Sequence, residues 1–165
     1  MTENLVNYLR SVEVNGCSVE EANAIYLLSS RLAQHQMKDL SFVHSPTDLE
    51  HYLRNAYMGL QHEVMGIVFL NASNAVLAID ELFQGTINSA QVYPRRIVEK
   101  ALYYGANTVF LFHNHPSGNI KPSEADRNIT DRIKSALKLV DIDITDHLIV
   151  GKEGTYSFAE NHFLS

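Results

Sequence analysis

One segment of the chain restricts its fold more than any other: the run from Val64 to Leu70 is apolar at every position. A strand that carries apolar side chains on both faces is buried on both faces, which requires other elements packed above and below its sheet. The run is also the longest of its kind in the sequence, and it is far too short to cross a membrane as a helix. We therefore expect a sheet with a covered strand, and no association with a membrane.

Segments with helical and strand periodicity alternate around this run. Predicted helices begin at Ser45, at Pro94 and at Ser123, each with apolar residues at helical spacing. Predicted strands cover 75–83, 108–112, 147–150 and 156–158, while 85–92 is either another strand or an irregular connection. This order of elements indicates the α/β (α+β) class.

The chain length suits one compact domain with a helical segment before it. Its 165 residues are enough to bury a sizeable core. Ser18 and Glu21 have the spacing of a capping box at the start of a helix. We assign residues 1–40 to an N-terminal helical segment and residues 41–165 to the domain that carries the motifs described below. The first residues lack the pattern of a signal peptide, so we expect a cytoplasmic protein.

Charge and cysteine content exclude several functions. The chain has 13 Lys and Arg against 19 Asp and Glu, a net charge of −6, which does not support nucleic acid as a partner, although a local basic patch is compatible with it. Cys17 is the single cysteine, so an internal disulfide and zinc sites built from paired cysteines, including those of nucleobase deaminases, are excluded. Any bound metal must be held by His and carboxylate side chains.

Two histidines stand where the predicted strand 108–112 runs into a breaker at Pro116. Side chains alternate along a strand, so His113 and His115 leave one face and Asn114 leaves the other. The next helix begins at Ser123, and Asp126 in its first turn can return a carboxylate to the two imidazoles. Two His and one Asp would hold a zinc ion and leave one position open for water, whose pKa a catalytic zinc lowers to about 7.

Two further residues complete a candidate hydrolytic site. Glu63 places a carboxylate directly before the apolar run, where a charge has no packing role, and it is the candidate general base. The hydroxyl of Ser123 can hydrogen-bond the oxyanion that forms when a carbonyl is attacked. Together with the metal ligands, these parts predict hydrolysis of an amide or a related carbon–nitrogen bond.

The motif residues also have simpler interpretations when each is taken alone. Ser123-x-x-Asp126 is an ordinary helix start, and an isolated His-x-His is more often a surface or core pair than a ligand pair. Glu63 alone could be an exposed strand end.

Other polar pairs allow two interpretations as well. Asp146 and His147 either support the metal ligands from behind or make local hydrogen bonds at a strand end. The basic residues Arg95, Arg96 and Lys100 are typical of a solvated helix face.

The combination of residues resembles a known motif, that of the JAMM (MPN+) metalloproteases, in which a Glu precedes His-x-His-x7-Ser-x-x-Asp. The wider sequence resembles the RadC family from about Leu40 to the end of the chain. The matching segments are Gly85-Thr86, Val92-Tyr-Pro-Arg95, His113-Asn-His-Pro-Ser-Gly118, Pro122-Ser123, Asp146-His147 and Tyr156-Ser-Phe158.

This resemblance implies a fold and a set of roles. It implies a mixed β-sheet flanked by helices, similar to the cytidine-deaminase-like arrangement. The implied ligands of Zn²⁺ are His113, His115 and Asp126, with Glu63 as acid/base and Ser123 as oxyanion partner. Full-length RadC proteins also carry an N-terminal helix-hairpin-helix region associated with DNA, and residues 1–40 show no Gly-rich hairpin of that kind.

The expected function is a zinc-dependent hydrolase of the metallopeptidase or isopeptidase type, acting on a peptide or protein. JAMM relatives cleave isopeptide bonds next to ubiquitin-like proteins. The alternative is a metal-binding but weakly active RadC-like module in DNA maintenance or protein scaffolding.

Overall fold

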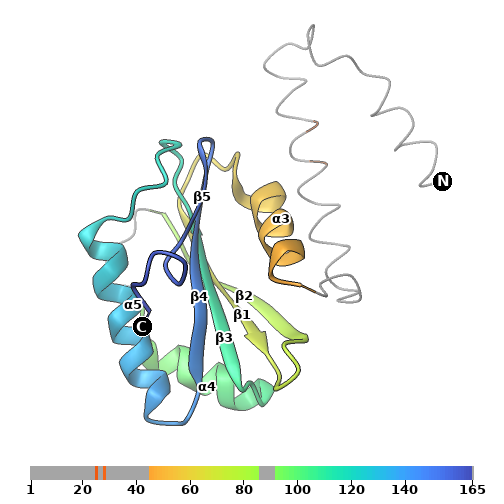
Figure 1. The fold of residues 1–165 in the computed structure, drawn as a ribbon, viewed down its shortest axis with the longest axis vertical. Helices are drawn as coiled ribbons and strands as arrows, with labels where there is room; N and C mark the ends of the chain where they lie inside the picture. Colours follow the sequence, from red (N-terminus) through yellow and green to blue (C-terminus); the bar gives the residue numbers. More distant parts are fainter. Residues whose placement is uncertain (1–24, 26–27, 29–44, 86–91, 165) are drawn as a thin grey trace, which may run out of the picture.

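The computed structural model describes residues 25, 28, 45–85 and 92–164, and the fold reported below is that of these residues (Figure 1). The predicted helical segment 1–40 lies outside the described residues except for Ile25 and Leu28. Most of the predicted connection 85–92 lies outside them too, so the structure tests neither of these predictions.

The described strands form one five-stranded sheet with the order β2-β1-β3-β4-β5. They are β1 (Val64–Leu70), β2 (Val76–Gln84), β3 (Thr108–Asn114), β4 (Asp143–Gly151) and β5 (Gly154–Ser157). Neighbouring strands are antiparallel except β3 and β4, which are parallel. A parallel pair needs a crossover connection, and helix α5 (Glu124–Lys138) provides it. The mixed sheet that the resemblance implied is confirmed.

Helices cover both faces of this sheet (Figure 1). Helix α3 (Pro46–Tyr57) packs on one face, and α4 (Pro94–Tyr104) and α5 pack on the other. All residues of β1 are buried: Met65, Ile67 and Phe69 belong to the core under α4 and α5, whereas Val64, Val68 and Leu70 belong to the core under α3. The prediction of a strand covered on both faces is therefore confirmed.

The helices begin at the residues that the sequence indicated. The hydroxyl oxygens of Ser45 and Ser123 each accept a 3.1 Å hydrogen bond from the backbone N–H three residues later, at the start of α3 and α5. Pro94 opens α4, and Gly105 ends it in the left-handed conformation, with φ 65°. Within the described ranges, none of the helices combines the length and the hydrophobicity that a membrane crossing requires.

The last hairpin differs from its prediction. Strand β4 begins at Asp143 and not at His147, because its first residues pair with β3 and alternate between exposed and half-buried positions. The sequence Asp143-Ile-Thr-Asp146 is too polar to be recognised as a strand on its own. His147 consequently lies in the interior of β4, opposite Leu111 of β3, and not at a strand end.

Candidate metal centre

The carboxyl end of β3 and the first turn of α5 meet at one edge of the sheet. In β-α-β units with parallel strands, the end of the first strand and the start of the helix lie at the same edge, where ligands commonly bind. His113 belongs to β3. His115 follows β3, and its N–H donates to the carbonyl of Val150 at 2.9 Å. Asp126 lies in the first turn of α5, so the connection brings its carboxylate back toward the two rings.

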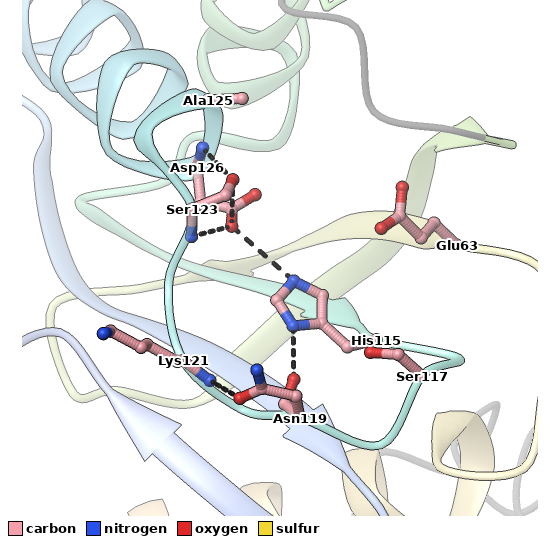
Figure 2. Close-up of a pocket in the computed structure, with 8 residues that line it drawn as sticks. All are labelled: Glu63, His115, Ser117, Asn119, Lys121, Ser123, Ala125 and Asp126. Carbon is pink, nitrogen blue, oxygen red and sulfur yellow. Dashed lines mark hydrogen bonds and ion pairs between the residues drawn. The ribbon is translucent and has the colours of Figure 1, made fainter.

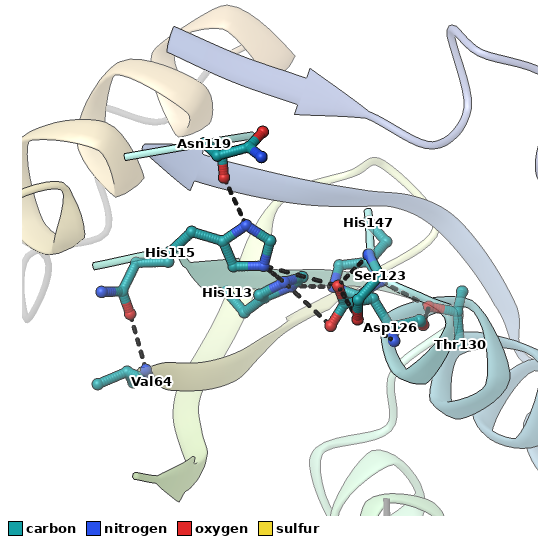
Figure 3. Close-up of polar contacts among 9 residues, drawn as sticks. Val64, His113, His115, Asn119, Ser123, Asp126, Thr130 and His147 are labelled. Atoms are coloured by element: carbon teal, nitrogen blue, oxygen red, sulfur yellow. Dashed lines mark hydrogen bonds and ion pairs between the residues drawn. The ribbon is translucent and has the colours of Figure 1, made fainter. Parts of the chain in front are cut away.

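The side chains of His113, His115 and Asp126 converge on one point (Figure 3). The Nε2 atoms of the two histidines lie 2.9 Å apart. One carboxylate oxygen of Asp126 is 3.3 Å from Nε2 of His113, and the other is 3.6 Å from Nε2 of His115. Ligands about 2.1 Å from a tetrahedral zinc ion lie about 3.4 Å from one another. The observed distances lie on both sides of this value, and one donor atom from each side chain could bind a common metal ion.

The donor chemistry of this cluster also fits a cation. Nδ1 of His115 lies 2.6 Å from the backbone carbonyl oxygen of Asn119. A carbonyl only accepts, so Nδ1 carries the proton and Nε2 of the neutral ring keeps its lone pair. This lone pair, the facing ring of His113 and the carboxylate all point to one position, which only a proton or a metal cation can occupy favourably.

Asp126 remains ionised although it is buried. Burial raises the pKa of its carboxyl group, but the adjacent imidazoles of His113 and His115 and the hydrogen bond from Ser123 outweigh burial and hold the pKa well below the usual 3.8. The backbone N–H and the hydroxyl of Ser123 both donate to the same carboxylate oxygen at 2.7 Å. The other oxygen is left facing His113. The N-terminus of α5 favours the negative charge further.

His115 and His147 respond to their surroundings in opposite directions. The hydrogen bond to Asp126 raises the pKa of His115 above the usual 6.5, against the effect of burial. Burial lowers the pKa of His147 well below 6.5, so this ring is neutral. Of the two histidines of the triad, His115 is the one nearer to solvent.

Glu63 stands across a cavity from the carboxylate of Asp126 (Figure 2). The cavity has a volume of about 350 Å³ and is open to solvent. Its walls are formed by Glu63, His115, Ser117, Asn119, Lys121, Ser123, Ala125 and Asp126. Glu63 is half-buried and lies directly before β1. The structure thus brings together all five residues that the motif singled out.

A comparison with protein families agrees with this arrangement. The family model described as a RadC-like JAB domain matches residues 43–163. The chain belongs to the RadC family.

Curated relatives of this RadC-family chain carry the name UPF0758 protein. One from Nitrosospira multiformis is 42% identical over 140 residues, which cover 85% of this chain and 62% of the relative. One from an Acidovorax species is 41% identical, with 85% of this chain and 59% of the relative covered. One from Pseudoalteromonas translucida is 44% identical, with 85% and 62% covered. The chain therefore spans about three fifths of the length of these relatives, whose name states no activity.

The site of this RadC-family chain contains residues whose roles the sequence did not reveal. Asn114, which alternation places on the opposite face of β3, binds the backbone on both sides of Glu63. Thr130 lies behind the metal ligands, in contact with His147. The only signal in the sequence for Thr130 is its position four residues after Asp126, one helical turn further along α5.

The basic residues Arg95, Arg96 and Lys100 are not brought to the site. Arg95 and Arg96 pair with Glu99 on the surface of α4, and Lys100 pairs with Asp80 of β2 at 2.8 Å. The interpretation of this group as a solvated helix face fits the structure.

Proposed function

We propose that this chain hydrolyses amide bonds as a metal-dependent peptidase or isopeptidase, with zinc held by His113, His115 and Asp126. The observation that carries the proposal is the convergence of two imidazole nitrogens and a carboxylate at the edge of a cavity that also contains Glu63. Three protein ligands leave a position open, as in catalytic zinc sites. When bound, the metal would activate a water molecule and polarise the carbonyl under attack.

Glu63 serves as the acid/base in this proposal. Its carboxylate accepts a proton from the attacking water and passes it to the nitrogen of the leaving amine as the carbon–nitrogen bond breaks. The products are a carboxylic acid and an amine. The position of Glu63 across the cavity from Asp126 suits a proton transfer between water and substrate, because substrate must lie between the two carboxylates.

Ser123 stabilises the oxyanion that forms on the attacked carbonyl. Its hydroxyl has one proton, which it donates to Asp126. The same carboxylate oxygen also accepts the N–H of Ser123 at 2.7 Å, so the hydroxyl can turn toward a substrate without leaving that oxygen unsatisfied. Once turned, the hydroxyl donates to the negative charge that develops on the carbonyl oxygen in the transition state.

The openness of the cavity favours a peptide or protein as substrate. Its lining is mainly polar, and backbone groups of an extended peptide can hydrogen-bond to such a lining. An isopeptide bond, in which a Lys side chain supplies the amine, presents the same carbonyl chemistry.

The proposal is tested with zinc-loaded protein and a mixture of linear and Lys-branched peptides, followed by mass spectrometry of new termini. Wild type should produce cleavage products, and Glu63→Gln should lower the cleavage rate by about 100-fold or more while keeping its zinc. Glu153→Gln, an exposed residue of the β4–β5 turn, is the matched control and should cleave like wild type. Zinc binding without cleavage by wild type would favour the alternative of a metal-binding module.

The ligand assignment has its own measurement, the zinc content of purified protein. His115→Ala and Asp126→Ala should each lose most of the zinc, whereas His51→Ala, an exposed residue of α3 on the opposite face of the sheet, should retain it. Equal zinc content in all four proteins would refute the assignment.

A further inference from the structure

A chain of hydrogen bonds leads from His113 away from the cavity into the protein (Figure 3). Nδ1 of His113 lies 2.8 Å from Nε2 of His147 on β4. Nδ1 of His147 lies 2.6 Å from the hydroxyl oxygen of Thr130 on α5. The hydroxyl of Thr130 donates to the backbone carbonyl of Asp126 at 2.6 Å. This relay of His113, His147 and Thr130 joins β3, β4 and α5. It ends on Asp126, which supplies the carboxylate of the triad.

The direction of each bond follows from the groups involved. A carbonyl only accepts, so the single hydroxyl proton of Thr130 is used toward Asp126. The oxygen of Thr130 then accepts Nδ1–H from His147, and Nε2 of that neutral ring keeps a lone pair. His113 consequently donates from its Nδ1 to His147. In a neutral ring this leaves the lone pair of His113 on Nε2, the atom that faces His115 and Asp126.

We propose that Thr130 and His147 are positioning residues that hold His113 in the tautomer whose Nε2 can bind a metal. The proposal rests on the metal-dependent function proposed above. In the other tautomer, Nε2 of His113 would carry a proton and point an N–H at the position of the cation. Groups behind a metal-bound histidine commonly fix its tautomer and orientation in this way.

The side chains of the relay are buried, so the directions of its hydrogen bonds depend on the hydroxyl of Thr130. The exposed fraction is 0% for His113 and His147 and 1% for Thr130. The ring of Phe158 stacks on His147, with centroids 4.7 Å apart and planes 23° apart. Phe163 packs against Phe158 in turn. Water therefore has no direct access to the relay, and a lost hydroxyl group at Thr130 is not readily replaced.

The first experiment reads the ring nitrogens of the metal-free protein by long-range ¹H–¹⁵N NMR. In wild type, His113 and His147 should both carry their proton on Nδ1. In Thr130→Val, which keeps the shape and removes the hydroxyl, a fraction of both rings should carry it on Nε2. Thr130→Ser should restore the wild-type pattern. A purely structural role of Thr130 would change the melting temperature of the variants and not their tautomers.

The second experiment measures zinc affinity with a competing chelator. Thr130→Val should bind zinc about 10–100-fold more weakly than wild type, as found when such supporting groups are removed, and Thr130→Ser should bind it normally. Thr145→Val is the matched control, because the hydroxyl of Thr145 also donates to a backbone carbonyl, that of Val109, outside the site. It should leave both the tautomers and the affinity unchanged.

The outcomes separate this proposal from the proposed function. A proton on Nε2 of His113 in metal-free wild type overturns the proposal, even if Thr130→Val fails to fold. Unchanged tautomers and affinity in Thr130→Val overturn it as well. If the tautomers are as expected and wild type binds no zinc, the positioning role stands and the proposed metal chemistry fails.

Discussion

Asn114 holds the backbone on both sides of Glu63. Its side-chain oxygen accepts a 2.7 Å hydrogen bond from the N–H of Val64, and its amide nitrogen donates to the carbonyl of His62 at 3.0 Å. Asn114 lies between His113 and His115 in the sequence. The strand that carries the two histidines therefore also sets the position of the candidate base, through a fully buried side chain.

Strand β3 and the residue that follows it supply the two histidine ligands, and Asn114 of this strand positions Glu63. Replacement of Asn114 by Ala should separate these two roles. The change leaves the buried N–H of Val64 without its acceptor, which should lower the free energy of unfolding by about 1–3 kcal/mol. Glu63 should lose its fixed position, and kcat should fall by up to about 100-fold, since small displacements of a reacting group are costly. Zinc content should stay at the wild-type value.

The control for Asn114→Ala is Asn71→Ala. The side chain of Asn71 likewise makes two hydrogen bonds to the backbone, both accepted by its oxygen, in the β1–β2 turn far from the site. Chemical denaturation, metal analysis and kinetics of both variants form the measurement. Equal losses of activity in both variants would assign the effect to general instability.

Ser123→Ala should affect catalysis more than stability. Ser123 and Ser45 cap their helices with the same 3.1 Å bond, so alanine at either position should lower the free energy of unfolding by about 1 kcal/mol. Only Ser123 borders the cavity. Ser123→Ala should therefore lower kcat by about 100-fold, the usual effect of removing one oxyanion donor, and Ser45→Ala should leave it unchanged. Similar kcat values for the two variants would remove Ser123 from the mechanism.

The sequence predicted the parts of the site that are close together in the chain. The spacing of His113, His115 and Asp126 follows from local rules, namely alternation along a strand and the first turn of a capped helix. The contact of His113 with His147 was one of two interpretations that the sequence left open. The sequence could not decide between them, because the contact depends on β3 and β4 being parallel neighbours with Leu111 opposite His147. The same limit applies to Asn114, whose partners are Val64 of β1 and His62 just before that strand.

The simpler interpretation of Ser123-x-x-Asp126 is also present in the structure. The pair forms a complete capping box, with bonds in both directions between side chain and backbone. Structural and functional interpretations of this motif are therefore not alternatives: one carboxylate oxygen takes part in the cap while the other faces His113. Sequence alone could not assign the two oxygens to different tasks.

As the pH rises, the stability that protonated His115 gives the metal-free protein should fall, while the affinity for zinc should increase. The pKa of His115 in the folded, metal-free protein is raised above 6.5. The stabilisation from its protonated form is thus fully present below pH 6.5 and is lost as the pH rises through the raised value. Zinc requires the deprotonated ring, so its binding strengthens over the same range. Asp126, with its lowered pKa, contributes stability above its usual 3.8 and loses it as the pH falls.

The measurement is the melting temperature with saturating zinc and with a chelator, taken at several values from pH 6.5 upward. The difference between the two curves should grow as the pH rises. Histidines outside the site, such as His51, contribute equally to both curves, so His51→Ala should reproduce the wild-type difference. A difference independent of pH would show that zinc binding displaces no proton from the histidines of the triad.

Gly66→Ala should destabilise the fold without touching the site. Gly66 lies in β1 beside Phe112 of β3, and a Cβ at this position would lie 2.1 Å from the ring of Phe112. That ring is fully buried and packs against Tyr57 of α3, with centroids 4.7 Å apart, so it has little room to move. Overpacking of this kind lowers the free energy of unfolding by about 1–3 kcal/mol.

Denaturant titration of Gly66→Ala and of Gly66→Ala/Phe112→Leu checks this explanation. The smaller side chain at position 112 should make room for the added methyl group, so the double variant should lose less stability than the sum of the two single changes. Zinc affinity should be unaffected in both proteins, because Phe112 and Gly66 lie on the α3 side of the sheet and the triad lies on the α5 side. If the losses of unfolding free energy in the two single variants simply add in the double variant, a clash with the ring of Phe112 is not the reason for glycine at position 66.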